Sequence, residues 1–103
     1  MIVEQIRYYI GEQDKDETLL ARREETRVRV ELGLPPGHIL VADPGPPEVP
    51  ALVWQCIYED ESAMAAATAK LIGNAGYEAI RERLRALTLK VELELYTADE
   101  DGA

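Results

Sequence analysis

Arg7 is the residue whose type and position most directly indicate chemistry. It lies in residues 2–10, whose side chains alternate between the two faces of a predicted strand. On an inward face, its planar set of donors could anchor a ligand carboxylate or an enolate. It could equally pair with Glu92 or Glu94 on the last strand, which should be its neighbour. Pairing is the favoured interpretation because the acidic side chains would otherwise be unpaired, and the two roles are compatible.

Aromatic residues extend this candidate surface. Tyr9, Tyr58 and Tyr96 could offer hydroxyl donors to a bound aromatic or acyl molecule, and Trp54 could stack on it. The alternative is packing in a dimer core, which is favoured for Trp54 and left open for the tyrosines. The predicted ligand-binding cavity consists of Gln5, Arg7, Tyr9, Trp54, Cys56, Tyr58, Glu92, Glu94 and Tyr96.

The single histidine and the single cysteine form no catalytic or metal-binding pattern. His38 follows Pro-Pro-Gly and is expected to begin an exposed strand, although it could act as a general base if it pointed into the cavity. Cys56 has no basic residue beside it in the sequence and is expected to behave as a small buried hydrophobe. These residues supply no metal-ligand spacing, and the glycines form no phosphate-binding fingerprint. We expect no metal and no cofactor, and no catalytic residue can be assigned.

A defined order of strands and helices must position these residues. Alternating apolar side chains predict strands at residues 2–10, 51–59 and 88–96, and a short apolar run between proline-rich segments predicts another at residues 38–43. Helices are predicted at residues 17–32, 60–72 and 74–87, with Gly73 and Asn74 between the last two. Residues 27–32 could also alternate as a strand, but Glu25 and Arg29 form a favourable helical pair. The proline-rich residues 44–50 should lie outside the sheet or at its edge, because proline cannot donate to a strand ladder.

This order predicts an α+β fold, the ferredoxin-like βαββαβ sandwich, with helices on one face of an antiparallel sheet. The last helix should pack on the sheet through a stripe of Tyr77, Ile80, Leu84 and Leu87. The second sheet face would carry the cavity residues, and it is too aromatic to be left in water. Pairing this face in a homodimer would bury it around a partly polar interior.

Length and composition narrow the alternatives. The chain has 103 residues and a net charge of -9. We expect a single domain over residues 1–97 and a disordered acidic tail over residues 98–103. The acidic balance argues against nucleic acid and anionic membranes as partners. One cysteine excludes an internal disulfide, and no signal peptide or membrane span is recognisable, so the protein is expected to be cytoplasmic.

Two segments of the sequence carry a resemblance to a known family: QIRYYI at residues 5–10, and WQCIYEDESAM at residues 54–64. The first is similar to the opening strand of the NIPSNAP-like family of the dimeric α/β-barrel superfamily. The second is similar to that family's third strand and the alanine-rich helix that follows. The break at residues 73–74 followed by Tyr77 also fits. Gln5 replaces the family's usual acid, and Cys56 stands where a tryptophan is expected. The resemblance implies a homodimer in a superfamily that contains cofactor-independent monooxygenases, heme-degrading enzymes and many members without known activity.

Two functional hypotheses follow from these observations. In the first, a homodimeric barrel binds a small aromatic or acidic organic molecule, with cofactor-independent oxygenase or isomerase chemistry as its enzymatic form. Arg7 would stabilise developing negative charge, and Tyr9 or Tyr58 would orient the substrate. In the second, the protein is a non-catalytic binding or assembly module whose polar interior pairs only with itself.

Overall fold

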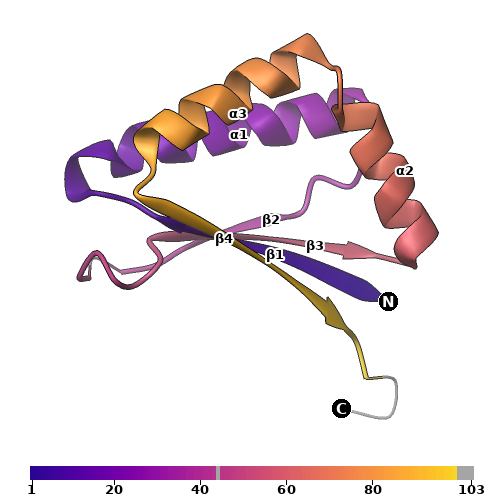
Figure 1. Cartoon of the computed structure of the whole chain (residues 1–103), viewed down its shortest axis with the longest axis horizontal. Coiled ribbons are helices and arrows are strands. Elements are labelled where there is room, and N and C mark those ends of the chain that lie inside the picture. The colour runs from indigo at the N-terminus through magenta and orange to yellow at the C-terminus, as the bar shows by residue number, and fades with distance from the viewer. Residues whose placement is uncertain (44, 100–103) are drawn as a thin grey trace.

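Four strands form one antiparallel sheet in the order β2-β3-β1-β4, and the helices lie together on one of its faces (Figure 1). In this computed structural model, which describes residues 1–43 and 45–99, the strands are β1 (Ile2–Tyr9), β2 (His38–Val41), β3 (Leu52–Tyr58) and β4 (Lys90–Thr97). The helices are α1 (Lys15–Glu31), α2 (Glu61–Leu71) and α3 (Ala75–Leu87), and a short 3-10 turn, η1 (Glu12–Asp14), precedes α1. The arrangement is ferredoxin-like and confirms the predicted α+β fold.

Short polar side chains define where α2 and α3 begin. Asp60 Oδ1 accepts a hydrogen bond from the Ala63 N–H at 2.8 Å, and Asn74 Oδ1 accepts one from the Tyr77 N–H at 3.0 Å. Such caps satisfy backbone donors that the first helical turn leaves free. Gly73, at φ +84°, supplies the left-handed residue that ends α2. The predicted interruption is therefore a complete break between two helices.

The proline-rich segment and the residues after β4 lie at the margins of the sheet. Residues 45–50 lie outside all four strands, as predicted, while Pro44 is outside the described residues. At the other margin, the Ala98 N–H donates to the Met1 carbonyl at 2.9 Å, so the chain still lies beside β1 just after β4. Residues 100–103 of the predicted tail lie outside the described residues.

β3 is the most deeply buried strand. The side chains of Leu52, Trp54, Cys56 and Tyr58 are each at most 4% exposed, and they pack beneath the helices. Ile6 of β1 lies directly opposite Trp54. Residues that lie opposite each other in a sheet point to the same face, so this side of β3 joins the helix-facing side of β1.

The prediction that Trp54, Cys56 and Tyr58 lie on the second sheet face is therefore wrong. Both faces of residues 51–59 read as apolar, because Val53 and Ile57 alternate with the larger side chains. The hydrophobic pattern alone could not choose between the faces. The β1–β3 register makes the choice, since a shift by one residue would move every side chain to the other face.

Gly37 allows the segment before β2 to pack against Trp54. Its φ of +72° favours glycine, and a Cβ atom at this position would lie 2.4 Å from Trp54 Nε1. The indole N–H donates to the Pro36 carbonyl at 3.0 Å. The Pro-Pro-Gly sequence thus satisfies the polar atom of a fully buried tryptophan.

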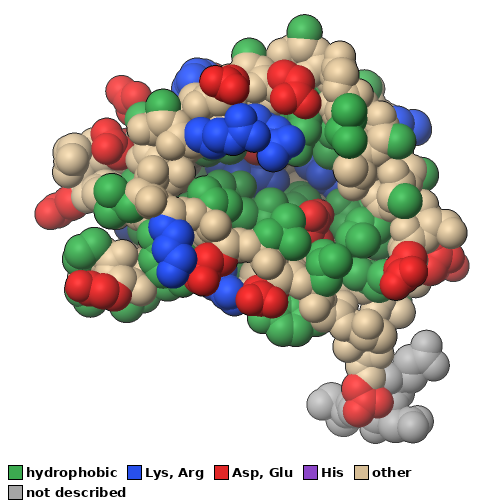
Figure 2. All heavy atoms as spheres, in the orientation of Figure 1, with side chains coloured by type: hydrophobic (Ala, Val, Ile, Leu, Met, Phe, Trp, Pro, Cys, Tyr) green, Lys and Arg blue, Asp and Glu red, His purple; other side chains and the backbone are tan. Residues whose placement is uncertain are grey.

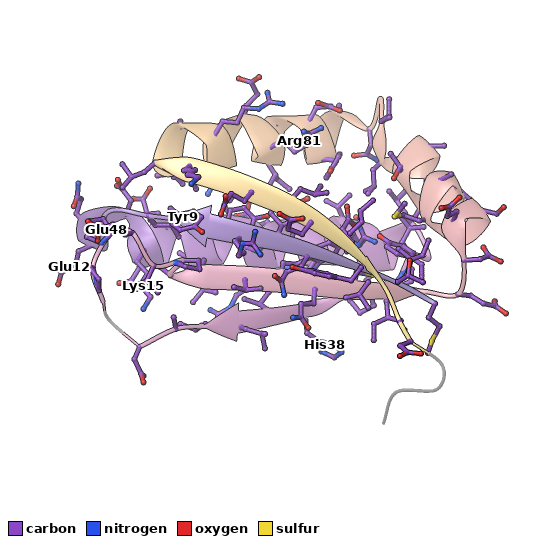
Figure 3. The ribbon with its side chains drawn as sticks, turned by 60° about the horizontal axis from the view of Figure 1, so that its bottom comes forward. Tyr9, Glu12, Lys15, His38, Glu48 and Arg81 are labelled. Atoms are coloured by element: carbon purple, nitrogen blue, oxygen red, sulfur yellow. The ribbon has the colours of Figure 1, made fainter. Side chains whose placement is uncertain are left out.

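No helix of the described part of the chain covers the other face of the sheet (Figure 3). In the β1–β4 register, Gln5 lies opposite Glu94 and Arg7 lies opposite Glu92 on this open face. Ile57 shares the face and is 57% exposed. The open face is thus partly apolar and partly charged, but it lacks the tryptophan that was expected there.

α3 packs on the sheet through the predicted stripe. Ile80 and Leu84 are buried in the core, while Tyr77 and Leu87 are half-buried beside them. The exposed positions of the helix are mainly charged or small, as the spacing of the apolar residues predicts.

Replacing Leu84 with alanine should lower the free energy of unfolding by about 2–5 kcal/mol, because the change leaves a cavity at a buried site. Urea denaturation measures this loss. Leu89→Ala is the matched control, since Leu89 is 67% exposed and its truncation should cost well under about 1 kcal/mol. Equal losses for the two variants would contradict the packing of α3 described here.

Candidate functional site

A cavity of about 440 Å³ lies between the helix-facing side of the sheet and helices α2 and α3. Figure 2 shows it as a hollow with hydrophobic side chains on its floor and basic side chains along one rim. Val91 and Leu93 of β4 line it and remain 46% and 54% exposed, so the cavity opens to solvent beside this strand. Arg81 and Arg85 of α3 line the opposite side.

Charged residues of α1 form the inner wall of the cavity. Arg22, Glu25 and Arg29 are 1%, 6% and 3% exposed, which is rare for charged side chains. Glu25 and Arg29 line the cavity directly. Arg22 Nη1 lies 2.8 Å from Glu25 Oε2, but neither atom has a hydrogen-bond partner among the described residues. The contact between them is therefore an ion pair without hydrogen-bond alignment.

Arg29 connects α1 to the sheet. Its Nε donates to the Pro35 carbonyl at 2.7 Å, and its Nη2 donates to the Tyr58 hydroxyl at 2.7 Å. That hydroxyl in turn donates to Glu4 Oε1 at 3.2 Å. Within residues 1–43 and 45–99, Arg29 Nη1 has no hydrogen-bond partner. One donor group on the cavity wall is thus left for a ligand.

Trp54 lies against both buried arginines of α1. The guanidinium carbon of Arg22 is 4.4 Å from the centroid of the indole ring, and that of Arg29 is 4.8 Å from it. A cation over the face of tryptophan is attracted by the ring's quadrupole, more strongly when water is excluded. The indole therefore helps to compensate both guanidinium groups for the loss of water.

Burial changes the acidity of the groups around the cavity. Loss of water raises the pKa of Glu25, although the charges of Arg22 and Arg29 oppose the change. Burial also raises the pKa of Tyr8 and Tyr77 above the ordinary value for a phenol. The tyrosines consequently remain protonated hydrogen-bond donors, whereas Glu25 binds a proton more readily than an exposed glutamate does.

The open face of the sheet carries a separate polar network. Arg7 Nε lies 3.5 Å from Glu92 Oε1, and Arg7 Nη2 lies 3.4 Å from Glu94 Oε1, which confirms the predicted pairing. Arg7 Nη1 also donates to Gln5 Oε1 at 3.1 Å. The Tyr9 hydroxyl donates to Glu92 Oε1 at 2.5 Å, and this hydrogen bond lowers the pKa of Glu92. The carboxylates facing Arg7 are thus partnered within the chain.

The structure divides the predicted cavity residues between the two faces. The residues on the open face are Gln5, Arg7, Tyr9, Glu92, Glu94 and Tyr96. Trp54 and Tyr58 instead line the cavity beneath the helices. Cys56 is buried beside them, with its Sγ 3.8 Å from Arg29 Nη2. The predicted set is therefore not one site.

The candidate nucleophile and base lie apart from any catalytic arrangement. His38 is exposed at the start of β2, as predicted, and Figure 3 shows it on the far side of the molecule from Arg81. Cys56 is buried and free. No group of histidine, cysteine, aspartate and glutamate side chains in the described part of the chain could hold a metal ion. Within that same part of the chain, no helix has the length and hydropathy needed to cross a membrane.

Sequence reasoning missed the charged residues of α1. Arg22, Glu25 and Arg29 are spaced by three and four residues, which places them on one side of a helix. Only a thin apolar stripe, formed by Leu20, Ala21, Val28 and Leu32, recurs along this helix in the sequence. So thin a stripe is a signal that some of the charged residues are buried as well. Glu25 was expected to pair with Arg29, but the structure pairs it with Arg22 instead.

The fold occurs in several solved structures. A NIPSNAP family protein from Agrobacterium tumefaciens superposes with a TM-score of 0.76 at 24% identity, covering 97% of this chain and 94% of that one. An uncharacterised NIPSNAP domain protein from Burkholderia xenovorans gives 0.75 at 19% identity, covering 100% and 99% of the two chains. A protein solved as an antibiotic biosynthesis monooxygenase gives 0.72 at 15% identity, covering 96% and 99%. The fold resemblance inferred from the sequence is thus confirmed.

Comparisons at the sequence level give no further assignment. No protein-family model matches the chain. No curated protein matches it significantly either. The similarity to NIPSNAP proteins and to the monooxygenase therefore rests on the arrangement of strands and helices.

The raised pKa of Glu25 predicts how a Glu25→Gln variant responds to pH. Ionising Glu25 costs more free energy in the folded than in the unfolded state. The wild-type protein therefore loses stability as the pH rises above 4.5, the ordinary pKa of glutamate, whereas a glutamine at this position does not ionise. We expect the free energy of unfolding of Glu25→Gln, relative to wild type, to increase from pH 4.5 to pH 7. Urea unfolding at several pH values measures it. Glu24→Gln should show no such trend, and a flat or falling difference for Glu25→Gln would contradict the burial cost.

Proposed function

We propose that the protein binds a small organic anion, aromatic or acidic in character, in the cavity between the sheet and α3. The observation that carries this proposal is that Arg29 lines the cavity and that its Nη1 has no hydrogen-bond partner among the described residues. The side chain of Arg29 is 3% exposed, and a buried guanidinium donor binds carboxylate or enolate oxygens more strongly than one in water. Tyr58 and Tyr77 add aromatic surface with polar tips, which suits a ligand with a ring.

The size and charge of the cavity support the same class of ligand. Small-molecule sites usually enclose about 300–1,000 Å³, and this cavity has about 440 Å³. Three arginines, Arg29, Arg81 and Arg85, line it against two glutamates, Glu4 and Glu25. Although the chain as a whole has a net charge of -9, more basic than acidic residues line this cavity. This local excess of positive charge favours an anion there.

The enzymatic form of the proposal is cofactor-independent oxygenase or isomerase chemistry. One structure with the same fold is an antibiotic biosynthesis monooxygenase, which supports this reaction class by analogy of fold. Such chemistry needs a donor for a developing oxyanion, and the position of Arg29 suits it better than that of Arg7. Arg7 lies on the other side of the sheet and is partnered by Glu92 and Glu94.

We propose in addition that the open face of the sheet pairs with a second copy of the chain. Leu40 and Ile57 leave about half of their surface in water on this face, at 49% and 57% exposure. Arg7 and Lys90 together balance Glu92 and Glu94 on this face, so burying it against an identical face would leave few charges unmatched. A homodimer of this kind is an assembly function, compatible with ligand binding on the other side of each sheet.

Ligand binding can be tested with phenylpyruvate and phenylacetate, which combine a ring with a carboxylate. We expect saturable binding in an NMR titration, weakened about tenfold or more by Arg81→Met, because the variant removes a charged donor and keeps the aliphatic stem. Arg83→Met is the matched control, because Arg83 pairs with Glu24 on the exposed surface and should leave binding unchanged. Failure of both acids to bind at millimolar concentration would overturn the proposal.

The homodimer can be tested by sedimentation equilibrium at micromolar concentration. Wild type should sediment as a dimer, and Arg7→Glu should shift it towards monomer by placing a third acid beside Glu92 and Glu94. Arg83→Glu makes the same change of charge on an exposed helix position and should remain dimeric. A stable, folded wild-type monomer would sink this part of the proposal.

A further inference from the structure

Glu25 and Arg29 lie one helical turn apart on α1, and both line the cavity. Residues at this spacing are neighbours, with Cβ atoms about 5–6 Å apart. The structure nevertheless pairs Glu25 with Arg22, and Arg29 with Pro35 and Tyr58. Among the described residues, neither Glu25 Oε1 nor Arg29 Nη1 has a hydrogen-bond partner. A carboxylate acceptor and a guanidinium donor therefore lie side by side on the cavity wall, both available to one ligand.

We propose that Glu25 is a general base and Arg29 an enolate donor, acting together on a small anionic ketone or keto acid with an acidic C–H beside its carbonyl. The inference rests on the proposed function and names its substrate class. The C–H bond breaks and its proton passes to the Glu25 carboxylate. The bonding pair forms a C=C bond, and the carbonyl oxygen becomes an enolate oxygen that accepts from Arg29 Nη1. Return of a proton to the same carbon reverses this enolisation and regenerates the ketone, so the cycle exchanges the C–H proton and needs no oxidant or cofactor.

The surroundings of Glu25 suit a base. Arg22 faces it from α1, Arg29 from the next turn, Tyr8 from β1, and Tyr77 and Arg81 from α3. The ion pair with Arg22 holds one carboxylate oxygen in place and leaves the other for the ligand. Burial raises the pKa of Glu25, and a carboxylate of higher pKa accepts a proton from carbon more readily.

The opposite wall supplies the remaining recognition. Arg81 lines the cavity from α3 and has no ion-pair partner among the described residues, so it can take the carboxylate of a keto acid. The ketone group would then lie towards α1, where it can reach both Glu25 and Arg29. These two binding positions distinguish a keto acid from a simple carboxylic acid, which has no ketone oxygen to offer to Arg29.

The test measures exchange of the methylene protons of phenylpyruvate with D₂O by proton NMR, with binding followed in the same samples. Wild type should accelerate the exchange about 100-fold over buffer, the size of effect that a positioned base supplies. Glu25→Gln should bind phenylpyruvate and exchange its protons at the buffer rate. Glu24→Gln, one residue away on the exposed side and paired with Arg83, should behave as wild type.

The outcomes separate the two proposals. Binding by wild type with exchange at the buffer rate would overturn the enolisation proposal and leave ligand binding intact. Undiminished exchange in Glu25→Gln would show that another group is the base and would also overturn it. Absence of binding would overturn the proposed function, and this inference with it.

A second variant covers the case in which Glu25→Gln does not fold because Arg22 loses its counterion. Arg22→Met combined with Glu25→Gln removes both buried charges, a change that is often neutral or stabilising where removal of one partner is not. Circular dichroism establishes folding before exchange is measured. This double variant should also bind phenylpyruvate without accelerating its exchange.

Discussion

The burial of Arg22 and Arg29 against Trp54 is the interaction on which the rest of the structure depends. Removing two guanidinium groups from water is costly, and neither would be tolerated on an ordinary apolar core. Here the indole ring, the Glu25 carboxylate and the Pro35 carbonyl compensate them. Because these partners come from α1, β3 and the segment that follows α1, satisfying the charges also fixes the helix on the sheet.

The same interaction prepares the cavity before any ligand enters. Side chains that are held by several contacts lose little further freedom on binding, which is the main advantage of a preorganised site. Arg29 is held by Pro35, Tyr58 and Trp54, so its remaining donor has a defined direction. The outer wall is different: Val91 and Leu93 remain half-exposed, which leaves a route to solvent.

Local patterns were sufficient to predict much of the fold. Alternation identified β1, β3 and β4, and a short apolar run between proline-rich segments identified β2. Gly73 and Asn74 marked the break between α2 and α3, and the order of elements predicted the ferredoxin-like sheet. The pairing of Arg7 followed from placing the first and last strands side by side. Each of these features depends on residues near in sequence or on a single neighbouring strand.

The candidate site was harder to predict because it depends on contacts between distant elements. The β1–β3 register sets the face on which Trp54 lies. The apolar residues that alternate along β3 are compatible with either face, so the sequence pattern did not decide between them. Buried charges are rare, so Arg22, Glu25 and Arg29 looked like the solvent side of α1. Their partners explain why they are inside: Trp54 lies against both arginines, Glu25 pairs with Arg22, and the Pro35 carbonyl accepts from Arg29.

The close approach of Gly37 to Trp54 couples two positions that are far apart in the chain. A side chain at position 37 would occupy the space of the indole ring, and a smaller residue at position 54 would leave a void and two arginines without their aromatic partner. A substitution at either position alone should therefore lower the stability of the folded protein. Divergent relatives that keep this architecture should therefore show covariation between the two positions, together with changes in the charge of α1.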